Sequence, residues 1–89
     1  MKRILFVDDD RAVARAFALT VRPLGYEADV AAAGAEAIRL ARTRFYPIIV
    51  TDLRMPGMDG LTLIERLRPL CPATAFVILT GYPELDLRA

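Results

Sequence analysis

The sequence predicts an α/β fold in which helices cover a parallel β-sheet. Short apolar runs that suit buried strands alternate with segments of helical periodicity, which is typical of parallel strands joined by helical crossovers. Two of these runs, at residues 4–7 and 48–51, lead directly into aspartates. The second is soon followed by a turn rich in proline and glycine, at residues 55–60. Because chemistry in such sheets collects at the carboxyl ends of the strands, the functional site is expected at this edge.

The elements are expected to alternate from a first strand to a fourth. Asp10 is expected to cap the first helix, which Pro23 and Gly25 end. Pro47 is tolerated at the start of the third strand, where a missing N–H does no harm. The expected strands are residues 4–7, 26–31, 48–52 and 75–79, the expected helices are residues 10–22, 34–44 and 61–68, and residues 82–89 begin another segment.

Each expected helix carries apolar residues at a spacing that can line one face against the sheet. The residues expected on these faces are Val13, Ala16, Phe17, Thr20 and Val21 in the first helix, Ala37, Ile38 and Ala41 in the second, and Leu61, Ile64 and Leu67 in the third.

The composition describes one globular domain or part of one. The chain has 89 residues, of which 55% are hydrophobic, and a formal net charge of +1. This balance argues against nucleic-acid or membrane-surface binding through bulk charge. One cysteine, Cys71, permits no intrachain disulfide, and the lack of histidine excludes histidine-based sites. Only four apolar residues separate the basic start from the acids, too few for a signal peptide, so a cytoplasmic location is expected.

Three carboxylates are expected to meet where the first and third strands end. Asp8 and Asp9 follow the first strand, and Asp52 ends the third. An isolated Asp52 would more simply be a turn residue, but a second acidic cluster in the equivalent place changes that interpretation. Like charges gathered there repel unless one is protonated or a cation lies among them, and oxygen ligands suit Mg²⁺. The sequence therefore predicts an acidic metal pocket around a nucleophilic carboxylate.

Three motifs at strand ends resemble those of one family. V-D-D-D stands at residues 7–10, T-D-L-R-M-P-G-M-D-G at residues 51–60 and I-L-T-G at residues 78–81. In this order, and over essentially the whole chain, they resemble the response-regulator receiver domains, the CheY-like phosphoacceptor family. The resemblance implies a flavodoxin-like (CheY-like) parallel sheet with strand order 2-1-3-4, in which the first and third strands are neighbours.

The resemblance also implies roles for particular residues. Asp52 resembles the phosphoacceptor, and Asp8 and Asp9 resemble the acidic pair that holds Mg²⁺ together with it. The backbone carbonyl of Arg54 falls where the family supplies a further metal ligand. Thr80 resembles the switch hydroxyl that turns toward the phosphoryl group, although its position alone would also suit a strand-end hydroxyl bonded to a turn.

The resemblance stops before the family's fifth strand and last helix, so residues 1–89 are expected to form a receiver domain that is incomplete at its C-terminus. The fifth strand of the family carries a lysine that pairs with the phosphoryl oxygens. Lys2 is the sole lysine here and belongs to the wrong end of the first strand, which predicts weaker phosphorylation. The fourth strand, at residues 75–79, is left as an apolar edge, and we hypothesise a homodimer through it.

The function implied is that of a phosphoacceptor receiver module in a two-component (His-Asp phosphorelay) signalling system. A sensor histidine kinase or phosphotransfer protein would donate the phosphate to Asp52 with Mg²⁺. The module is a signalling domain and not an enzyme, with at most Mg²⁺-dependent self-phosphorylation and autodephosphorylation. No direct binding of nucleic acid or membrane is expected.

Three alternatives belong to other functional classes. The first is a truncated interaction or dimerisation module whose acidic pocket is vestigial. The second is a phosphohydrolase with an aspartyl nucleophile, but such enzymes keep a second aspartate two positions later, where this chain has Arg54. The third is a nucleotide-binding module, which would need a glycine-rich loop after the first strand in place of the acidic turn.

Overall fold

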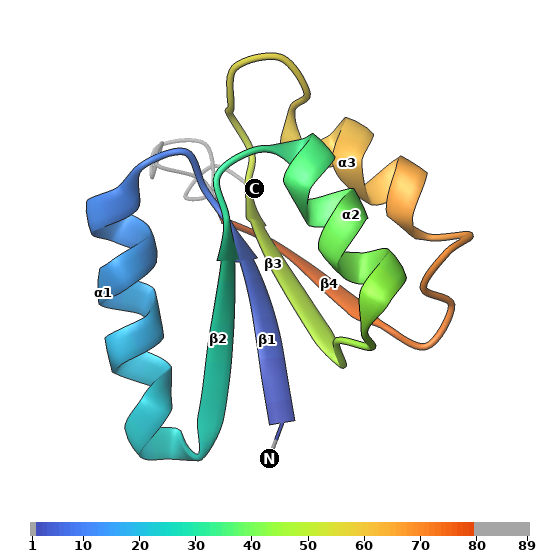
Figure 1. The fold of residues 1–89 in the computed structure, drawn as a ribbon. Coiled ribbons are helices and arrows are strands. Elements are labelled where there is room, and N and C mark those ends of the chain that lie inside the picture. The colour runs from blue at the N-terminus through green and yellow to red at the C-terminus, as the bar shows by residue number, and fades with distance from the viewer. Residues whose placement is uncertain (1, 80–89) are drawn as a thin grey trace, which may run out of the picture.

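Four parallel strands form a sheet with helices on both faces (Figure 1). The computed structural model describes residues 2–79. The strand order is β2-β1-β3-β4, which confirms the predicted order. In Figure 1, α1 lies on one side of the sheet, and α2 and α3 lie together on the other. The elements are β1 (Lys2–Val7), α1 (Arg11–Val21), the 3₁₀ turn η1 (Arg22–Leu24), β2 (Tyr26–Ala31), α2 (Gly34–Thr43), β3 (Ile48–Asp52), α3 (Gly60–Leu67) and β4 (Ala75–Leu79).

The two faces of the sheet pack into separate apolar clusters, because successive strand residues point to opposite sides. The cluster beneath α2 and α3 contains Leu5 and Ile49, both fully buried. The cluster beneath α1 contains Phe6, whose ring stacks on that of Phe17 with 4.2 Å between centroids. Strands β1 and β3 are covered on both faces, which explains their nearly continuous apolar sequences.

The predicted buried face of α1 was correct at Phe17 and Val21 and wrong at its other three positions. Ala14 and Val21 are buried, and Phe17 packs beside them, whereas Val13 is 45% exposed. Ala16 and Thr20, also predicted to face the sheet, are exposed. The stack of Phe17 on Phe6, with small Ala14 close to the strands, fixes the rotation. Alanines on several sides of this helix left its apolar face ambiguous in the sequence.

The third helix also differs from its predicted face. Leu61 is 56% exposed, whereas Leu63 is fully buried beside Ile64 and Leu67. Helix α3 begins one residue before the predicted start, at Gly60, and that glycine packs against the backbone of β3. This contact sets the rotation that turns Leu61 outward. The predicted buried face of α2 is confirmed. Ala37 is buried, and the partly buried Ile38 and Ala41 pack against the same cluster.

The predicted helix boundaries are explained by local hydrogen bonds. The carboxylate of Asp10 accepts from the amides of Ala12 and Val13 at 2.9 and 3.2 Å, which confirms it as the N-cap of α1. At the other end, Gly25 has φ +92°, a left-handed conformation that favours glycine. The turn at Gly25, which ends η1, leads the chain back into β2 at Tyr26.

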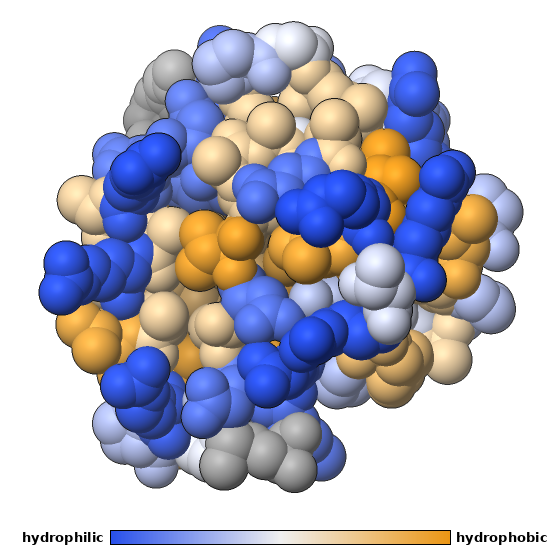
Figure 2. Space-filling view, viewed as in Figure 1, coloured by the Kyte–Doolittle hydropathy of each residue, from blue (hydrophilic) through white to orange (hydrophobic). Residues whose placement is uncertain are grey.

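The surface seen in Figure 2 carries small apolar patches separated by hydrophilic side chains. Within the described residues, no helix is both long enough and apolar enough to span a bilayer.

Candidate functional site

The carboxyl ends of β1 and β3 lie side by side. The register pairs Val7 with Thr51, so the residues that follow them leave the sheet together. On one side the amide of Asp8 donates to the carbonyl of Ala31 at 3.0 Å, and on the other the amide of Leu53 donates to Leu79 at 3.0 Å. The backbone on either side of the pocket is therefore held by the neighbouring strands.

Three carboxylates meet at this edge, as the strand order predicts. The carboxylate oxygens of Asp8, Asp9 and Asp52 lie within 4.8 Å of one another. Asp8 is buried with 7% of its surface exposed, Asp52 is half-buried and Asp9 is exposed. A hollow of about 440 Å³ opens over them, with Phe6 and Leu79 also in its lining.

Burial, together with crowded negative charge, raises the pKa of the Asp8 carboxyl. Burial is the largest cause, a hydrogen bond from the Asp10 amide at 2.9 Å opposes it, and the charges of Asp52, Asp9 and Asp10 raise the pKa further. A carboxylate that is costly to ionise beside two others is the donor set that a divalent cation would stabilise. The residues present therefore fit Mg²⁺, which prefers oxygen ligands and keeps some of its waters.

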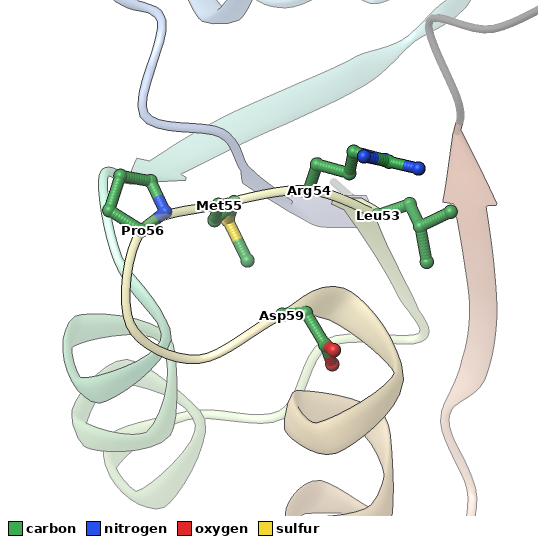
Figure 3. Close-up of a pocket in the computed structure, with 5 residues that line it drawn as sticks. All are labelled: Leu53, Arg54, Met55, Pro56 and Asp59. Carbon is green, nitrogen blue, oxygen red and sulfur yellow. The ribbon is translucent and has the colours of Figure 1, made fainter.

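The loop from β3 to α3 borders the acidic pocket and forms a second hollow of about 570 Å³ (Figure 3). Figure 3 shows the side chains of Leu53 and Arg54 extending to the side on which β4 lies, with Pro56 at the far bend. Met55 is buried at 8% exposure and anchors the loop to the core. Asp59 closes the loop as the N-cap of α3, and the hydrogen bond from the Thr62 amide lowers the pKa of its carboxyl.

Two residues that support Asp52 had no assigned role in the sequence. A Cβ at Gly60 would overlap the carbonyl oxygen of Asp52, so only glycine lets α3 begin this close to β3. The fully buried Thr51 donates its hydroxyl to the same carbonyl at 3.0 Å, and the Gly60 amide donates to Leu53 at 2.9 Å. These contacts fix the backbone on which the Asp52 carboxylate stands. The signal in the sequence was a glycine directly after an N-cap aspartate.

Not every predicted site residue can be located. Thr80 and the segment at residues 82–89 lie outside the described residues. Arg54 is exposed in the loop after Asp52, and the role of its carbonyl as a metal ligand stays a prediction. Lys2 begins β1 and therefore lies at the opposite end of that strand from the acids, as expected.

Comparison with known proteins finds one family. The model for the response regulator receiver domain matches residues 4–89. A response regulator receiver protein from Anaeromyxobacter sp. (strain Fw109-5) is 39% identical over 86 residues, which cover 97% of this chain and 36% of that protein. The chain spans between 18% and 43% of the length of eight curated relatives that it matches.

Solved structures agree on the fold. The response regulator TrrA from Thermotoga maritima, in complex with Mg²⁺ and BeF, aligns with a TM-score of 0.88 and 31% identity, covering 98% of this chain and 76% of that one. TrrA in complex with the histidine kinase ThkA aligns with a TM-score of 0.86 and 33% identity, covering 92% and 71%. These likenesses confirm the predicted sheet.

Proposed function

This chain belongs to the response regulator receiver domain family, and we propose that it accepts a phosphoryl group on Asp52. Receiver domains are phosphoacceptor domains of two-component signal transduction and not enzymes of the ordinary kind. The observation that carries the proposal is the pocket in which Asp52 ends β3 beside Asp8 and Asp9. An interaction module with a vestigial pocket is less favoured, because the three carboxylates keep an arrangement suited to a cation.

Asp52 would act as the nucleophile through a carboxylate oxygen. A new O–P bond forms as the bond between phosphorus and the donor breaks, and the leaving group keeps the electron pair. Mg²⁺ held by Asp8, Asp9, Asp52 and the backbone carbonyl of Arg54 would neutralise charge on the phosphoryl oxygens. Asp8 and Asp9 therefore act by holding the cation, and the fixed backbone around Asp52 aims the nucleophile.

A sensor histidine kinase or a phosphotransfer protein is the proposed donor. The regulator TrrA, to which this chain is similar, is found in complex with the histidine kinase ThkA, which supports a kinase of that class as partner. We also propose Thr80 as the switch hydroxyl, on the resemblance of the I-L-T-G motif. The cytoplasmic location expected from the sequence stays a prediction.

Acetyl phosphate tests the proposal without a cognate kinase. Incubation of the protein with acetyl phosphate and Mg²⁺ is expected to add the mass of one phosphoryl group, measured on the intact chain. Asp52→Ala removes the nucleophile and is expected to abolish the gain, and chelation of Mg²⁺ is expected to reduce it strongly.

A neighbouring carboxylate provides the matched control. Asp10 caps α1, a role that asparagine also fills, so Asp10→Asn is expected to accept phosphate like the wild type. A gain in mass that persists in Asp52→Ala would show that a residue other than Asp52 accepts the phosphoryl group, and would contradict the proposal. No gain in a sample whose circular dichroism is that of a folded α/β protein would contradict the proposed function.

We further propose that the chain self-associates through β4. Among the described strands β4 pairs with β3 alone, and its Val77 and Leu79 side chains are 42% and 43% exposed. Unpaired apolar edges bind other strands. Sedimentation velocity is expected to show a concentration-dependent dimer, and Val77→Lys, which sets like charges against each other, is expected to weaken it at least about fivefold.

The other edge of the sheet supplies the comparison for this prediction. Val30 on β2 is 40% exposed, close to the value for Val77, and β2 is the opposite edge strand. Val30→Lys is expected to leave the dimer unchanged. Equal effects of the two lysines, or a monodisperse monomer at high concentration, would count against pairing through β4.

A further inference from the structure

The loop between α2 and β3 presents an aromatic ring to solvent. Phe45 in this loop is 61% exposed, so most of its ring is available to a partner. A hollow of about 360 Å³ lies on one side of the loop and another of about 570 Å³ on the other. The first hollow is lined among others by Arg42, Leu70 and Pro72, and the second by Lys2, Arg44 and Pro47.

This surface lies at the end of the sheet away from the acidic pocket. Figure 1 shows the loop after α2, the loop after α3 and the start of β1 at the same end of the molecule. Phe45 precedes β3, whereas Asp52 ends it, and a strand of five residues separates them by roughly 16 Å. A partner bound here would leave the proposed phosphorylation site open.

The loop that carries Phe45 is held on both sides. The next residue, Tyr46, is 1% exposed and donates its hydroxyl to Asp29 at 2.7 Å. Its carbonyl accepts from the Thr74 hydroxyl at 2.6 Å, and the amide of Ala75 donates to Pro47 at 2.9 Å. Phe45 is therefore displayed by an anchored backbone, which lowers the entropy lost when a partner covers the ring.

Positive charge surrounds the ring. The cations Lys2, Arg3, Arg42 and Arg44 line the two hollows, and no carboxylate is among the described residues that line them. Nearby Asp29 already accepts from Arg3 at 2.9 Å and from Arg44 at 3.4 Å. In the part of the chain that the structure describes, Lys2 and Arg42 have no such partner. One uncompensated cation thus remains on each side of the ring.

We propose that this surface, formed by Lys2, Arg42, Phe45, Leu70 and Pro72 and called here the Phe45 face, docks an acidic protein segment that carries an apolar side chain. The apolar side chain packs on the ring and into the hollow beside Leu70 and Pro72. Carboxylates before and after it in the segment pair with Arg42 on one side and Lys2 on the other. Aromatic side chains, phenylalanine included, and arginine are enriched in protein interfaces.

The shape of the face favours a protein segment over a lipid surface. Two separate hollows flank the loop, and an extended chain that crosses Phe45 can fill both. A bilayer surface is planar on this scale and would meet the ring while leaving the hollows filled with water. Complementary charge then fixes the segment's position, because each cation meets a carboxylate of the same chain.

Fluorescence anisotropy with a labelled synthetic peptide tests the proposal. The probe is a twelve-residue peptide of Asp and Glu with two central Leu residues, compared with one in which Ser replaces Leu and one in which Lys replaces the acids. The Leu-containing acidic peptide is expected to bind most tightly. Phe45→Ser is expected to weaken the affinity for this peptide about tenfold. Arg42→Glu and Lys2→Glu are each expected to weaken it about threefold.

Matched variants on α1 separate the Phe45 face from the rest of the surface. Leu19 is 56% exposed and Arg15 is exposed, so Leu19→Ser and Arg15→Glu make the same changes elsewhere and are expected to leave binding unchanged. Equal weakening by the α1 variants, or equal binding of the lysine peptide, would overturn the proposal. Phe45-dependent binding to phosphatidylserine vesicles without binding of the acidic peptide would assign the face to a membrane and would also overturn it.

Discussion

Gly60→Ala is expected to destabilise the protein by about 2 kcal/mol and to slow the phosphorylation of Asp52. The added Cβ would overlap the carbonyl oxygen of Asp52 and press on Leu53. Because backbone atoms cannot rotate away, the cost lies near the upper end for overpacking, about 3 kcal/mol. The better helix propensity of alanine returns at most about 1 kcal/mol. Denaturant unfolding measures the stability, and the rate of mass gain with acetyl phosphate measures the phosphorylation.

Gly34→Ala is the matched control, because Gly34 is likewise the first residue of its helix. A Cβ there would meet the sulfur of Met58 at 2.8 Å, and that end of the flexible side chain can move aside, whereas the Met58 Cβ needs to shift by only a few tenths of an ångström. The stability of Gly34→Ala is therefore expected to stay within about 1 kcal/mol of the wild type. If the two alanine variants were equally stable, the packing of α3 against the backbone of Asp52 would not be what requires glycine.

The strands of this fold could be predicted from the sequence because a strand in a parallel sheet has a simple pattern, a short run of apolar residues bounded by turn residues. A continuous apolar run predicted β4, and a short stretch of alternating character predicted β2, both with the bounds that the structure has. The first strand begins earlier than predicted, at Lys2, because its backbone pairs with Tyr26 in β2 whatever its side chains are. Backbone pairing is set by the neighbouring strand, and the hydropathy of the residue does not report it.

The acidic pocket could be predicted because strand order alone brings Asp8 and Asp52 to one edge. The contacts that fix how the elements pack could not be predicted, because they join side chains from different elements. The hydroxyl of Tyr46 reaches Asp29 on β2, and the stack of Phe17 on Phe6 selects the buried face of α1. Periodicity describes which residues share a face, but it does not tell which face meets the sheet.

Asp8→Asn is expected to stabilise the protein in the absence of divalent metal at neutral pH while impairing phosphorylation. Burial and the charges of neighbouring carboxylates raise the pKa of Asp8 above its value in the unfolded chain. The native state therefore binds the Asp8 proton more tightly, and stability falls as pH rises from the unfolded pKa through the folded one. Asparagine does not ionise, so Asp8→Asn does not lose stability in this way. Its stability relative to the wild type should therefore increase as pH rises from the unfolded pKa of Asp8 to the folded one, and the difference should vanish at lower pH.

Mg²⁺ should reverse this order of stability and make the wild type more stable than Asp8→Asn. A cation that binds the native state stabilises it by about 1.4 kcal/mol at ten times its Kd. The wild type has Asp8, Asp9 and Asp52 within 4.8 Å to hold the ion, whereas the variant has lost one charged ligand and should gain less. Denaturant unfolding from pH 4 to pH 8, with and without Mg²⁺, measures both effects. A wild type that Mg²⁺ does not stabilise would contradict the proposed metal site.

Asp59→Asn tests whether the stabilisation expected for Asp8→Asn is specific to Asp8 or follows from removing any negative charge near the site. The pKa of Asp59 is lowered by the hydrogen bond from the Thr62 amide, so its carboxylate contributes stability at neutral pH that is lost as pH falls. Asparagine also caps helices, so this variant should be no more stable than the wild type and should respond to Mg²⁺ as the wild type does. Opposite pH slopes for the two substitutions follow from opposite environments: Asp8 is buried among like charges, and Asp59 faces the amino end of a helix.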